Sequence, residues 1–347
     1  MTLFSQIYCL AMKAKLISKT TQILFISAAC MLLLACERQS IKSPQEYPGV
    51  LHVGHLVGIC MSPLFVAYSK GYFSDEGLDV KLQWTTNPGD AINLLTTDSL
   101  QFTHGSFLAT YRAVDQGSEL RIVAGSGNHG LSCIARGDSG IKTLSDLAAR
   151  KNTGLKVGSQ RLNNLELAFY SLIKKLGLSY KDFDMVYFHD HFTMQTAFEK
   201  NEVSVVTHVE PYATMLTDRM NGVRIGDSQD AWGKGSPDCV VSVRADFLEK
   251  YPVTVKKYIR AILRGDAFVK QHLQEAIELL DKNKFYRVDK DILAAAIPRQ
   301  PPGVDLRAGV PAMLNAVKDA VDLGYLKEVP ERVVDLRLLN EVVHEKP

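Results

Sequence analysis

Strand-like and helix-like segments alternate along most of this chain, and this alternation restricts its fold more than any other feature. Short β-rich runs are followed by helical runs, with short connections between them. Such βα alternation is typical of a mostly parallel sheet with helices on both faces, so we predict an α/β fold. The first series contains strands 51–57, 78–84, 101–104 and 121–124 and helices 63–70, 90–95 and 106–116.

A second series of the same kind follows, and then a long helical tail. Its strands are predicted at 131–136, 156–158, 185–189, 203–207 and 223–226, and its helices at 143–149, 165–176, 193–200 and 212–220. A strand at 239–243 leads into a wholly helical tail from 245 to about 343. Two similar α/β units predict two lobes, between which the chain crosses at 125–131 and again at 236–241. The expected order is signal peptide 1–35, linker 36–49, lobe 1 at 50–127, lobe 2 at 128–238, and completion of lobe 1 with the helical tail at 239–347.

The N-terminal segment has the pattern of an export signal. Three lysines precede an apolar run from Ile23 to Ala35, which is too short to span a bilayer comfortably and ends on a small residue. The ending Leu33-Leu34-Ala35-Cys36 resembles the bacterial lipobox, which implies cleavage before Cys36 and lipidation of its thiol. A plain cleaved signal and a short anchor helix are the alternatives. We expect an exported protein, tethered through Cys36 to a membrane that faces the periplasm or the cell exterior.

Composition and charge indicate an ordinary globular domain. The chain is 46% hydrophobic and 22% charged, with a formal charge of +2. Residues 1–35 hold three Lys and no Asp, Glu or Arg, so their removal leaves about −1. No basic stripe indicates a nucleic-acid partner. Cys60, Cys133 and Cys239 are the cysteines downstream of Cys36; they are free buried thiols, or Cys133 pairs with Cys239.

Five motifs in order resemble one family of transport proteins. They are Val53-Gly-His-Leu with Ser62-Pro-Leu-Phe-Val-Ala and Gly71-Tyr-Phe-Ser-Asp-Glu-Gly-Leu-Asp-Val80, Ile134-Ala-Arg-Gly-Asp-Ser-Gly-Ile-Lys-Thr-Leu-Ser-Asp-Leu147, Val157-Gly-Ser-Gln, Glu210-Pro-Tyr-Ala-Thr214, and Val243-Arg-Ala-Asp-Phe-Leu-Glu-Lys-Tyr-Pro252. This order is similar to that of the nitrate/sulfonate/taurine/thiamine-precursor solute-binding proteins of ABC importers.

The resemblance implies a two-lobed periplasmic-binding-protein fold of type II, with two crossover strands and a ligand in the interlobe cleft. It also implies a permease and an ATPase as partners, no catalysis and no cofactor. We expect a monomer that captures a small polar or anionic molecule, such as a sulfonate, nitrate or a thiamine-precursor pyrimidine. A ligand-sensing component of a signalling receptor would have the same sequence features.

The candidate ligand-binding residues lie in loops at strand ends, where the N-termini of helices point into the crevice. These loops are rich in Gly, Ser, Thr and Asn, and Arg161 is their one clear cation. Trp84, Tyr212 and Trp232 could stack on a flat heterocycle or pack in the core. The predicted site comprises Cys60, Ser62, Trp84, Asp90, His104, Ser106, His129, Ser159, Gln160, Asn163, His189, His191, His208 and Glu210.

Five histidines in this set depart from the family pattern. A borderline metal such as Zn, Cu or Ni would favour imidazole ligands, above all the pair His189-x-His191. Imidazole N–H groups could instead grip an anion, or each histidine could be bonded locally. The sequence holds no tight metal motif, so no metal ligand is predicted, and a metal carrier remains an alternative function.

The sequence favours binding over catalysis. A related pyrimidine synthase carries a Cys-rich loop and an iron-bound His, whereas this chain has Gly58-Ile-Cys-Met-Ser62 where such a loop could lie. It also contains no convincing Ser-x-x-Lys, Gly-x-Ser-x-Gly or His-Glu-x-x-His signature. An enzyme of the synthase type is therefore the less favoured alternative.

Overall fold

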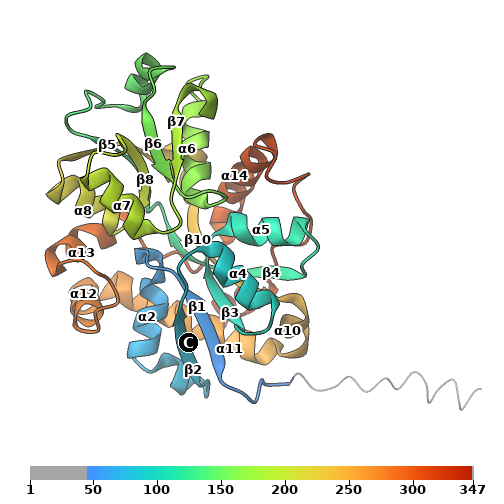
Figure 1. The fold of residues 1–347 in the computed structure, drawn as a ribbon. Helices are drawn as coiled ribbons and strands as arrows, with labels where there is room; N and C mark the ends of the chain where they lie inside the picture. The colour runs from blue at the N-terminus through green and yellow to red at the C-terminus, as the bar shows by residue number, and fades with distance from the viewer. Residues whose placement is uncertain (1–44, 346–347) are drawn as a thin grey trace, which may run out of the picture. The chain divides into compact units, whose positions relative to one another are not determined.

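The computed structural model describes residues 45–345, and the predicted signal peptide and Cys36 lie outside this range. Two five-stranded sheets form the framework (Figure 1). The first has the order β2-β1-β3-β10-β4 and the second the order β7-β6-β8-β5-β9. Their strands are β1 (Leu51–His55), β2 (Val80–Trp84), β3 (Phe102–Gly105), β4 (Leu120–Asn128) and β10 (Pro237–Arg244), and β5 (Leu131–Arg136), β6 (Lys156–Ser159), β7 (Asp184–Tyr187), β8 (Val205–Val209) and β9 (Gly222–Asp227).

The chain crosses between the sheets twice, once from β4 to β5 and once from helix α9 (Ser228–Trp232) to β10. Strand β1 runs parallel to β2 and β3, and β6 runs parallel to β7 and β8. The crossing strands are antiparallel to their neighbours: β10 to β3 and β4, and β5 to β8 and β9. The two-lobed α/β fold is confirmed, with each sheet as the centre of one lobe.

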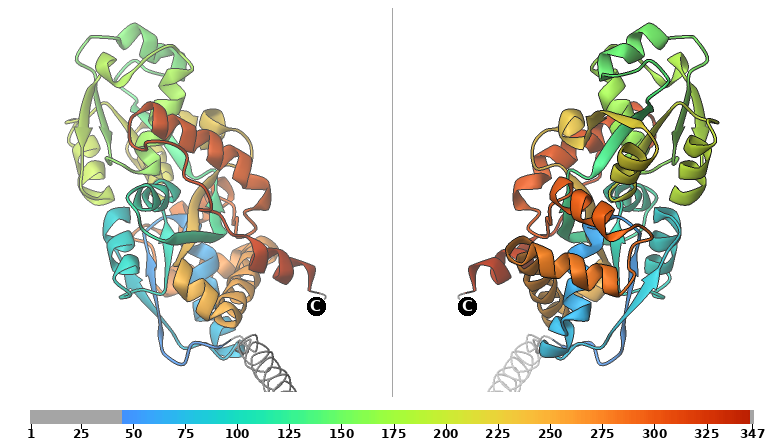
Figure 2. Two further views of the ribbon diagram at one scale, coloured as in Figure 1. Left: turned by 90° about the vertical axis from the view of Figure 1, so that its right-hand side faces the viewer. Right: turned by 90° about the vertical axis from the view of Figure 1, so that its left-hand side faces the viewer.

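Helices cover the faces of both sheets (Figures 1 and 2). The first lobe carries α2 (Ser62–Ser69), α3 (Tyr72–Asp75), α4 (Pro88–Thr96) and α5 (Phe107–Asp115); the second carries α6 (Asn164–Lys174), α7 (His191–Glu199), α8 (Tyr212–Arg219) and α9 (Ser228–Trp232). Pro63 lies in the first turn of α2, and Gly71, with φ of 75°, follows its end. The helix begins at Ser62, one residue before the predicted start at 63, and Met61 is its N-cap. The helix predicted at 143–149 is a 3₁₀ segment, Leu144–Arg150.

The tail contains α10 (Ala245–Lys250), α11 (Pro252–Gln271), α12 (Leu273–Lys282), α13 (Lys290–Ala296), α14 (Val310–Asp322) and α15 (Arg337–His344). The tail is not wholly helical, because Pro301, Pro302 and Gly303 interrupt it. A second non-helical segment contains Val333, whose carbonyl accepts a hydrogen bond from the Ile122 amide at the edge of β4. Helix α14 packs against α6 and α9 of the second lobe and also against α5 of the first. The tail therefore contacts both lobes.

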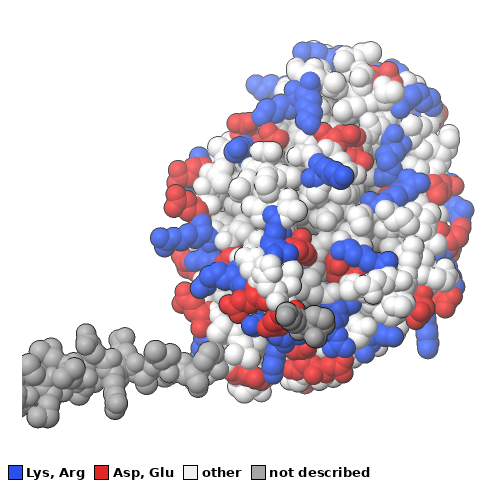
Figure 3. Space-filling view, turned by 180° about the vertical axis from the view of Figure 1, so that it is seen from behind, with Lys and Arg blue, Asp and Glu red and all other residues white. Residues whose placement is uncertain are grey.

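The polar segment predicted as a linker is joined to the domain at its C-terminal end. The Tyr47 amide donates to Thr254 Oγ1 at 2.7 Å, and the Tyr47 ring lies 5.3 Å from the ring of Phe247. Among the described residues, no helix is long and apolar enough to cross a membrane. Positive and negative side chains are interspersed over the face in Figure 3, a distribution unlike a nucleic-acid-binding stripe.

Candidate functional site

A small cavity, here called the inner chamber, lies where the two lobes meet. Its volume is about 20 Å³, which is room for about one water molecule. Its walls are Leu56, Gly58, Cys60 and Ser106 from the first lobe, Leu131, Asn163, Asn164, Leu165, His191 and Val209 from the second, and Asp238 and Cys239 from the start of β10. The lobes are therefore closed on each other.

A wider opening, here called the outer cleft, lies between α4 and α5 of the first lobe and the loops after β6 and β7. It has a volume of about 430 Å³. Its polar lining residues include Asn87, Asp90, Arg112, Gln160, Arg161, Asn163 and His189. Asn163 lines both cavities, so the outer cleft adjoins the inner chamber.

Asn164, the first residue of α6, connects the lobes through both ends of its side-chain amide. Its Oδ1 accepts from Ser106 Oγ at 2.7 Å and from the Leu108 amide at 3.1 Å, while its Nδ2 donates to the Asp238 carbonyl at 2.6 Å. Each such bond contributes about 0.5–1.5 kcal/mol net. The side chain therefore fixes the N-terminus of α6 against that of α5.

Two further contacts cross the cleft. The Ile59 amide donates to the Glu210 carbonyl at 2.8 Å, and Asn87 Nδ2 lies 3.3 Å from His189 Nε2. Gly58 makes the first of these possible, since a Cβ at that position would lie 2.8 Å from Val209 Cγ2. The close approach of the lobes thus requires a residue without a side chain at position 58.

Aromatic side chains from both lobes flank one cation at the cleft. The Arg287 guanidinium lies 5.6 Å from the centre of the Trp84 ring and 4.8 Å from that of Phe192. Trp84 is the last residue of β2 in the first lobe and is 47% exposed, whereas Phe192 lies in the first turn of α7. A flat cationic group is therefore already held between two rings, one from each lobe.

Several predicted residues reach the two cavities. Cys60, Ser106, Asn163 and His191 line the inner chamber, and Asp90, Gln160, Asn163 and His189 line the outer cleft. His191 is buried and its Nδ1 has no hydrogen-bond partner. Burial lowers the pKa of His191 to about 3, with a smaller effect from His208, so the ring is neutral near pH 7. It offers an uncharged donor or acceptor.

Other predicted residues are bonded within the protein, away from either cavity. His104 Nδ1 pairs with Ser126 Oγ at 2.9 Å and its Nε2 with Tyr258 OH at 2.8 Å in the interior of the first lobe. The Glu210 carboxylate accepts from Arg224 at 2.7 Å and from the Thr214 amide at 2.9 Å. The side chains of His104 and Glu210 therefore point away from the lobe interface, although the strands that lead to them end at this interface.

The remaining predictions have mixed placements. His129 Nε2 accepts from the Gly235 amide at 2.7 Å, and His208 Nε2 lies 3.2 Å from the His191 carbonyl. Ser62 and Ser159 are buried without a partner for their hydroxyls and line neither cavity. His189 and His191 line different cavities. Within residues 45–345, no group of three or more His, Cys, Asp or Glu side chains could hold a metal ion.

Sequence reasoning missed Asn164, Asp238, Asn87 and Arg287. Asn87 and Asn164 each lie between a predicted strand and the next predicted helix, but nothing in the sequence distinguishes the residue that crosses the cleft from its neighbours. Asp238 lies in the predicted crossing, and its carboxylate is buried. Its Oδ2 accepts from the Gly130 amide at 2.6 Å and from Gln300 Nε2 at 2.7 Å, and burial raises its pKa to about 7.

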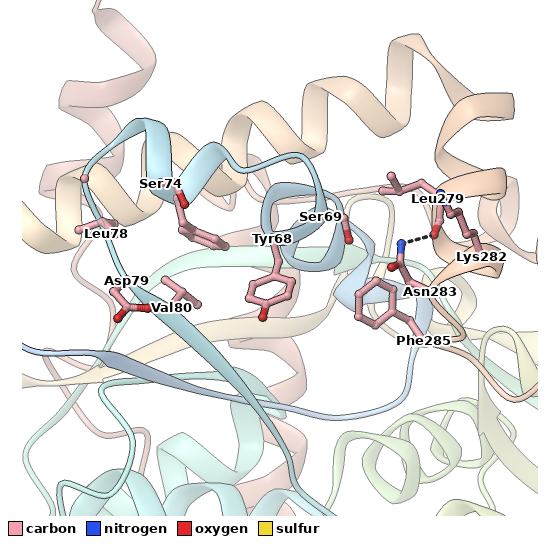
Figure 4. Close-up of a pocket in the computed structure, with 12 residues that line it drawn as sticks. Tyr68, Ser69, Ser74, Leu78, Asp79, Val80, Leu279, Lys282, Asn283 and Phe285 are labelled. Atoms are coloured by element: carbon pink, nitrogen blue, oxygen red, sulfur yellow. Dashed lines mark hydrogen bonds between the residues drawn. The ribbon is translucent and has the colours of Figure 1, made fainter.

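Two larger grooves lie elsewhere, with volumes of about 830 and 890 Å³. The first is formed by α2, α3, β2 and the end of α12, with Tyr68, Leu279 and Phe285 among its lining residues (Figure 4). In it, Asn283 Nδ2 donates to the Leu279 carbonyl at 2.7 Å. Its walls come from the first lobe and the tail, and none of them holds a buried unpartnered polar atom. Size alone therefore does not mark the ligand site.

Two α/β lobes joined by two crossing strands, with a chamber walled by both, define the class of two-lobed binding proteins. The structure is similar to that of the periplasmic nitrate-binding protein NrtA from Synechocystis PCC 6803, with a TM-score of 0.74, 16% identity and coverage of 86% of this chain and 89% of that one. This similarity establishes the fold.

The chain belongs to the NMT1/THI5-like family, whose sequence pattern matches residues 60–276. It is 25% identical to YtlA of Bacillus subtilis over 271 residues, which are 77% of this chain and 78% of the relative. It is 22% identical to the formylaminopyrimidine-binding protein of Halalkalibacterium halodurans over 278 residues, with coverage of 78% and 79%. The family resemblance drawn from the sequence motifs is confirmed.

Proposed function

We propose that this protein is a solute-binding protein that captures a small polar molecule between its lobes and delivers it to an ABC importer. The observation that carries this proposal is the inner chamber, whose walls come from both lobes and whose His191 Nδ1 is buried without a partner. A chamber built from two lobes changes shape when the lobes move. A ligand that contacts both walls therefore favours the closed state, which a permease can distinguish from the open state.

The lining of the inner chamber favours a neutral polar ligand over a fully charged anion. Among the described residues that line it, there is no Lys or Arg. The N-termini of α5, α6 and α7 are capped by Ser106, Asn163 and Asp190, which occupy some of the backbone donors that an oxyanion would use. Amide, hydroxyl and imidazole groups suit the ring nitrogens and amino group of a pyrimidine. The similarity to a formylaminopyrimidine-binding protein supports this class.

Ligand entry requires the lobes to separate. A chamber of about 20 Å³ holds about one water molecule, so a heterocycle fits only after its walls move apart. The contacts that must loosen include the hydrogen bonds of Asn164, the bond from the Ile59 amide to Glu210 and the contact between Asn87 and His189. These neutral bonds are few, so their loss is compatible with reversible opening.

The binding proposal is tested by calorimetric titration of the exported chain with formylaminopyrimidine, an alkanesulfonate and nitrate. We expect binding of the pyrimidine, a loss of at least tenfold in affinity in His191→Phe, and an unchanged affinity in His344→Ala. His344 is exposed on α15 and serves as the matched control. Equal affinity in wild type and His191→Phe would place the ligand outside the inner chamber. Binding of nitrate or the sulfonate alone would overturn the neutral-ligand assignment.

The same proposal includes a lipid anchor at Cys36. A diacylated cysteine is a stable tether, since each buried CH₂ contributes about 0.8 kcal/mol to membrane binding. We expect the wild type in the membrane fraction with a fatty-acid label on the chain, and Cys36→Ser unlabelled. Label retained in Cys36→Ser would contradict lipidation at this residue.

A further inference from the structure

Two thiols meet in the wall of the inner chamber. Cys60 Sγ and Cys239 Sγ are 2.7 Å apart, although 179 residues separate them in sequence. Cys60 lies in the 3₁₀ turn Ile59–Met61 and Cys239 in β10, and their exposed fractions are 1% and 7%. Cys133 is buried in β5, where it lies opposite Thr207 of β8. The thiol contact therefore differs from the pairing of Cys133 with Cys239 considered from the sequence.

A glycine sets the distance between the two cysteines. Cys239 pairs with Gly127 across β10 and β4, and a Cβ at position 127 would lie 2.6 Å from both Cα and Cβ of Cys60. The backbone of Cys60 therefore rests directly on β4, beside Cys239. Ser126 Oγ donates to the Cys60 carbonyl at 2.5 Å and holds the turn in this position. The thiol contact thus follows from the backbone arrangement as well as from the side-chain rotamers.

We propose that Cys60 and Cys239 are a redox pair that forms a disulfide in the exported protein. A disulfide has an S–S distance of about 2.05 Å, so the sulfurs need to approach by about 0.7 Å from their 2.7 Å contact. Disulfides form and persist in exported proteins, which is where the N-terminal sequence directs this chain. The proposal concerns a covalent modification and does not depend on which solute the chamber binds.

The oxidant is a second disulfide, either oxidised glutathione or the disulfide of an exported oxidoreductase. One cysteine loses its proton and attacks a sulfur of this disulfide, which forms a mixed disulfide and releases the first thiolate. The other cysteine then loses its proton and attacks the mixed disulfide, which expels the second thiolate. The cysteine pair loses two electrons and two protons, and the oxidant is reduced to two thiols.

Both sulfurs lie in residues that line the inner chamber, so opening of the lobes exposes them to the oxidant. Once formed, the bond ties the turn Ile59–Met61 to β10. This turn supplies the Ile59 amide that donates to Glu210 across the cleft. The oxidised protein therefore holds one wall of the chamber in the position that closure requires.

The bond is tested by peptide mass spectrometry of the wild-type protein. Trypsin separates the three cysteines, since Cys60 falls in peptide 43–70, Cys133 in 122–136 and Cys239 in 235–244. The protein is incubated with oxidised glutathione, unfolded, alkylated without reduction and digested. We expect peptides 43–70 and 235–244 to be joined, peptide 122–136 to be alkylated, and the joined species to disappear after dithiothreitol. Alkylation or glutathione adducts on both Cys60 and Cys239, without linkage, would overturn the proposal.

A second measurement compares melting temperatures with and without dithiothreitol. The closed loop is long, so oxidation is expected to raise the melting temperature by about 5–10 °C. Cys133→Ser is the matched control and should keep this difference, whereas Cys60→Ser and Cys239→Ser should lose it. An equal difference in Cys60→Ser would show that reduction acts elsewhere. If the Ser variants fail to fold, the peptide experiment on the wild type decides.

Discussion

At the scale of single residues, His104 shows how a polar side chain near the cleft can serve the core. Its two ring nitrogens pair with Ser126 and Tyr258, and burial lowers its pKa to about 3. We expect His104→Ala to lower the free energy of unfolding by about 2–4 kcal/mol, because it leaves a cavity and an unpaired Tyr258 hydroxyl. Urea unfolding measures this loss. The ligand affinity of the folded fraction should stay within twofold of the wild-type value. A loss of affinity without a loss of stability would instead show that His104 contacts the ligand.

Residue positions could be predicted from the sequence better than side-chain directions. Loops that follow strands were expected at the cleft, and Cys60, Ser106, Asn163 and His191 do reach the inner chamber. His104 and Glu210 occupy the same kind of position but turn toward Tyr258 and Arg224. The direction of each side chain depends on hydrogen-bond partners that are distant in the sequence, and no local sequence pattern indicates these partners.

At the scale of elements, the turn that carries Gly58 sets how closely the lobes approach. A Cβ there would meet Val209 Cγ2 at 2.8 Å, and such overpacking costs about 1–3 kcal/mol. We expect Gly58→Ala to weaken ligand binding roughly 5- to 150-fold by hindering closure. Titration calorimetry measures the affinity. Gly105→Ala is the control, because its nearest atoms lie at 3.7 and 4.0 Å. Equal affinities in the two variants would contradict this role of Gly58.

The order of the elements was predictable because hydrophobic periodicity and glycine stops are local signals. Gly71 and Gly177, for example, both follow a helix with a left-handed backbone. The contacts of the tail were not predictable in this way. The interruption at Pro301 and Pro302 is visible in the sequence, but the hydrogen bond from Ile122 to Val333 joins segments more than 200 residues apart.

At the scale of the whole molecule, buried titratable groups predict how stability depends on pH. Burial lowers the pKa of His104 and His191 to about 3 and of His208 to about 4. The neutral histidines therefore stabilise the folded state fully above pH 6.5, and this stabilisation is lost as the pH falls below 6.5. Asp238, with a pKa raised to about 7, contributes in the opposite sense, since its contribution is lost as the pH rises from about 4 to 7. Near pH 5 the unfolded state then binds about two more protons than the folded state.

We therefore expect the free energy of unfolding to rise with pH by roughly 2–3 kcal/mol per unit near pH 5. Urea unfolding between pH 5 and 8 measures this slope. Asp238→Asn removes the opposing group, so the free energy of unfolding of this variant should rise more steeply with pH. The increase in slope corresponds to a difference of about one bound proton. Stability that increases on acidification from pH 7 to 5 would contradict the neutral, buried state of the three histidines.

We propose that a small solute binds between the lobes, in contact with both of them. Hydrogen exchange of backbone amides, followed by mass spectrometry with and without formylaminopyrimidine, tests it most directly. We expect slower exchange on ligand binding in segments 58–62 and 106–108 of the first lobe and in 163–165 and 191–193 of the second. Protection confined to one lobe, or to the groove around Tyr68 and Phe285, would contradict it.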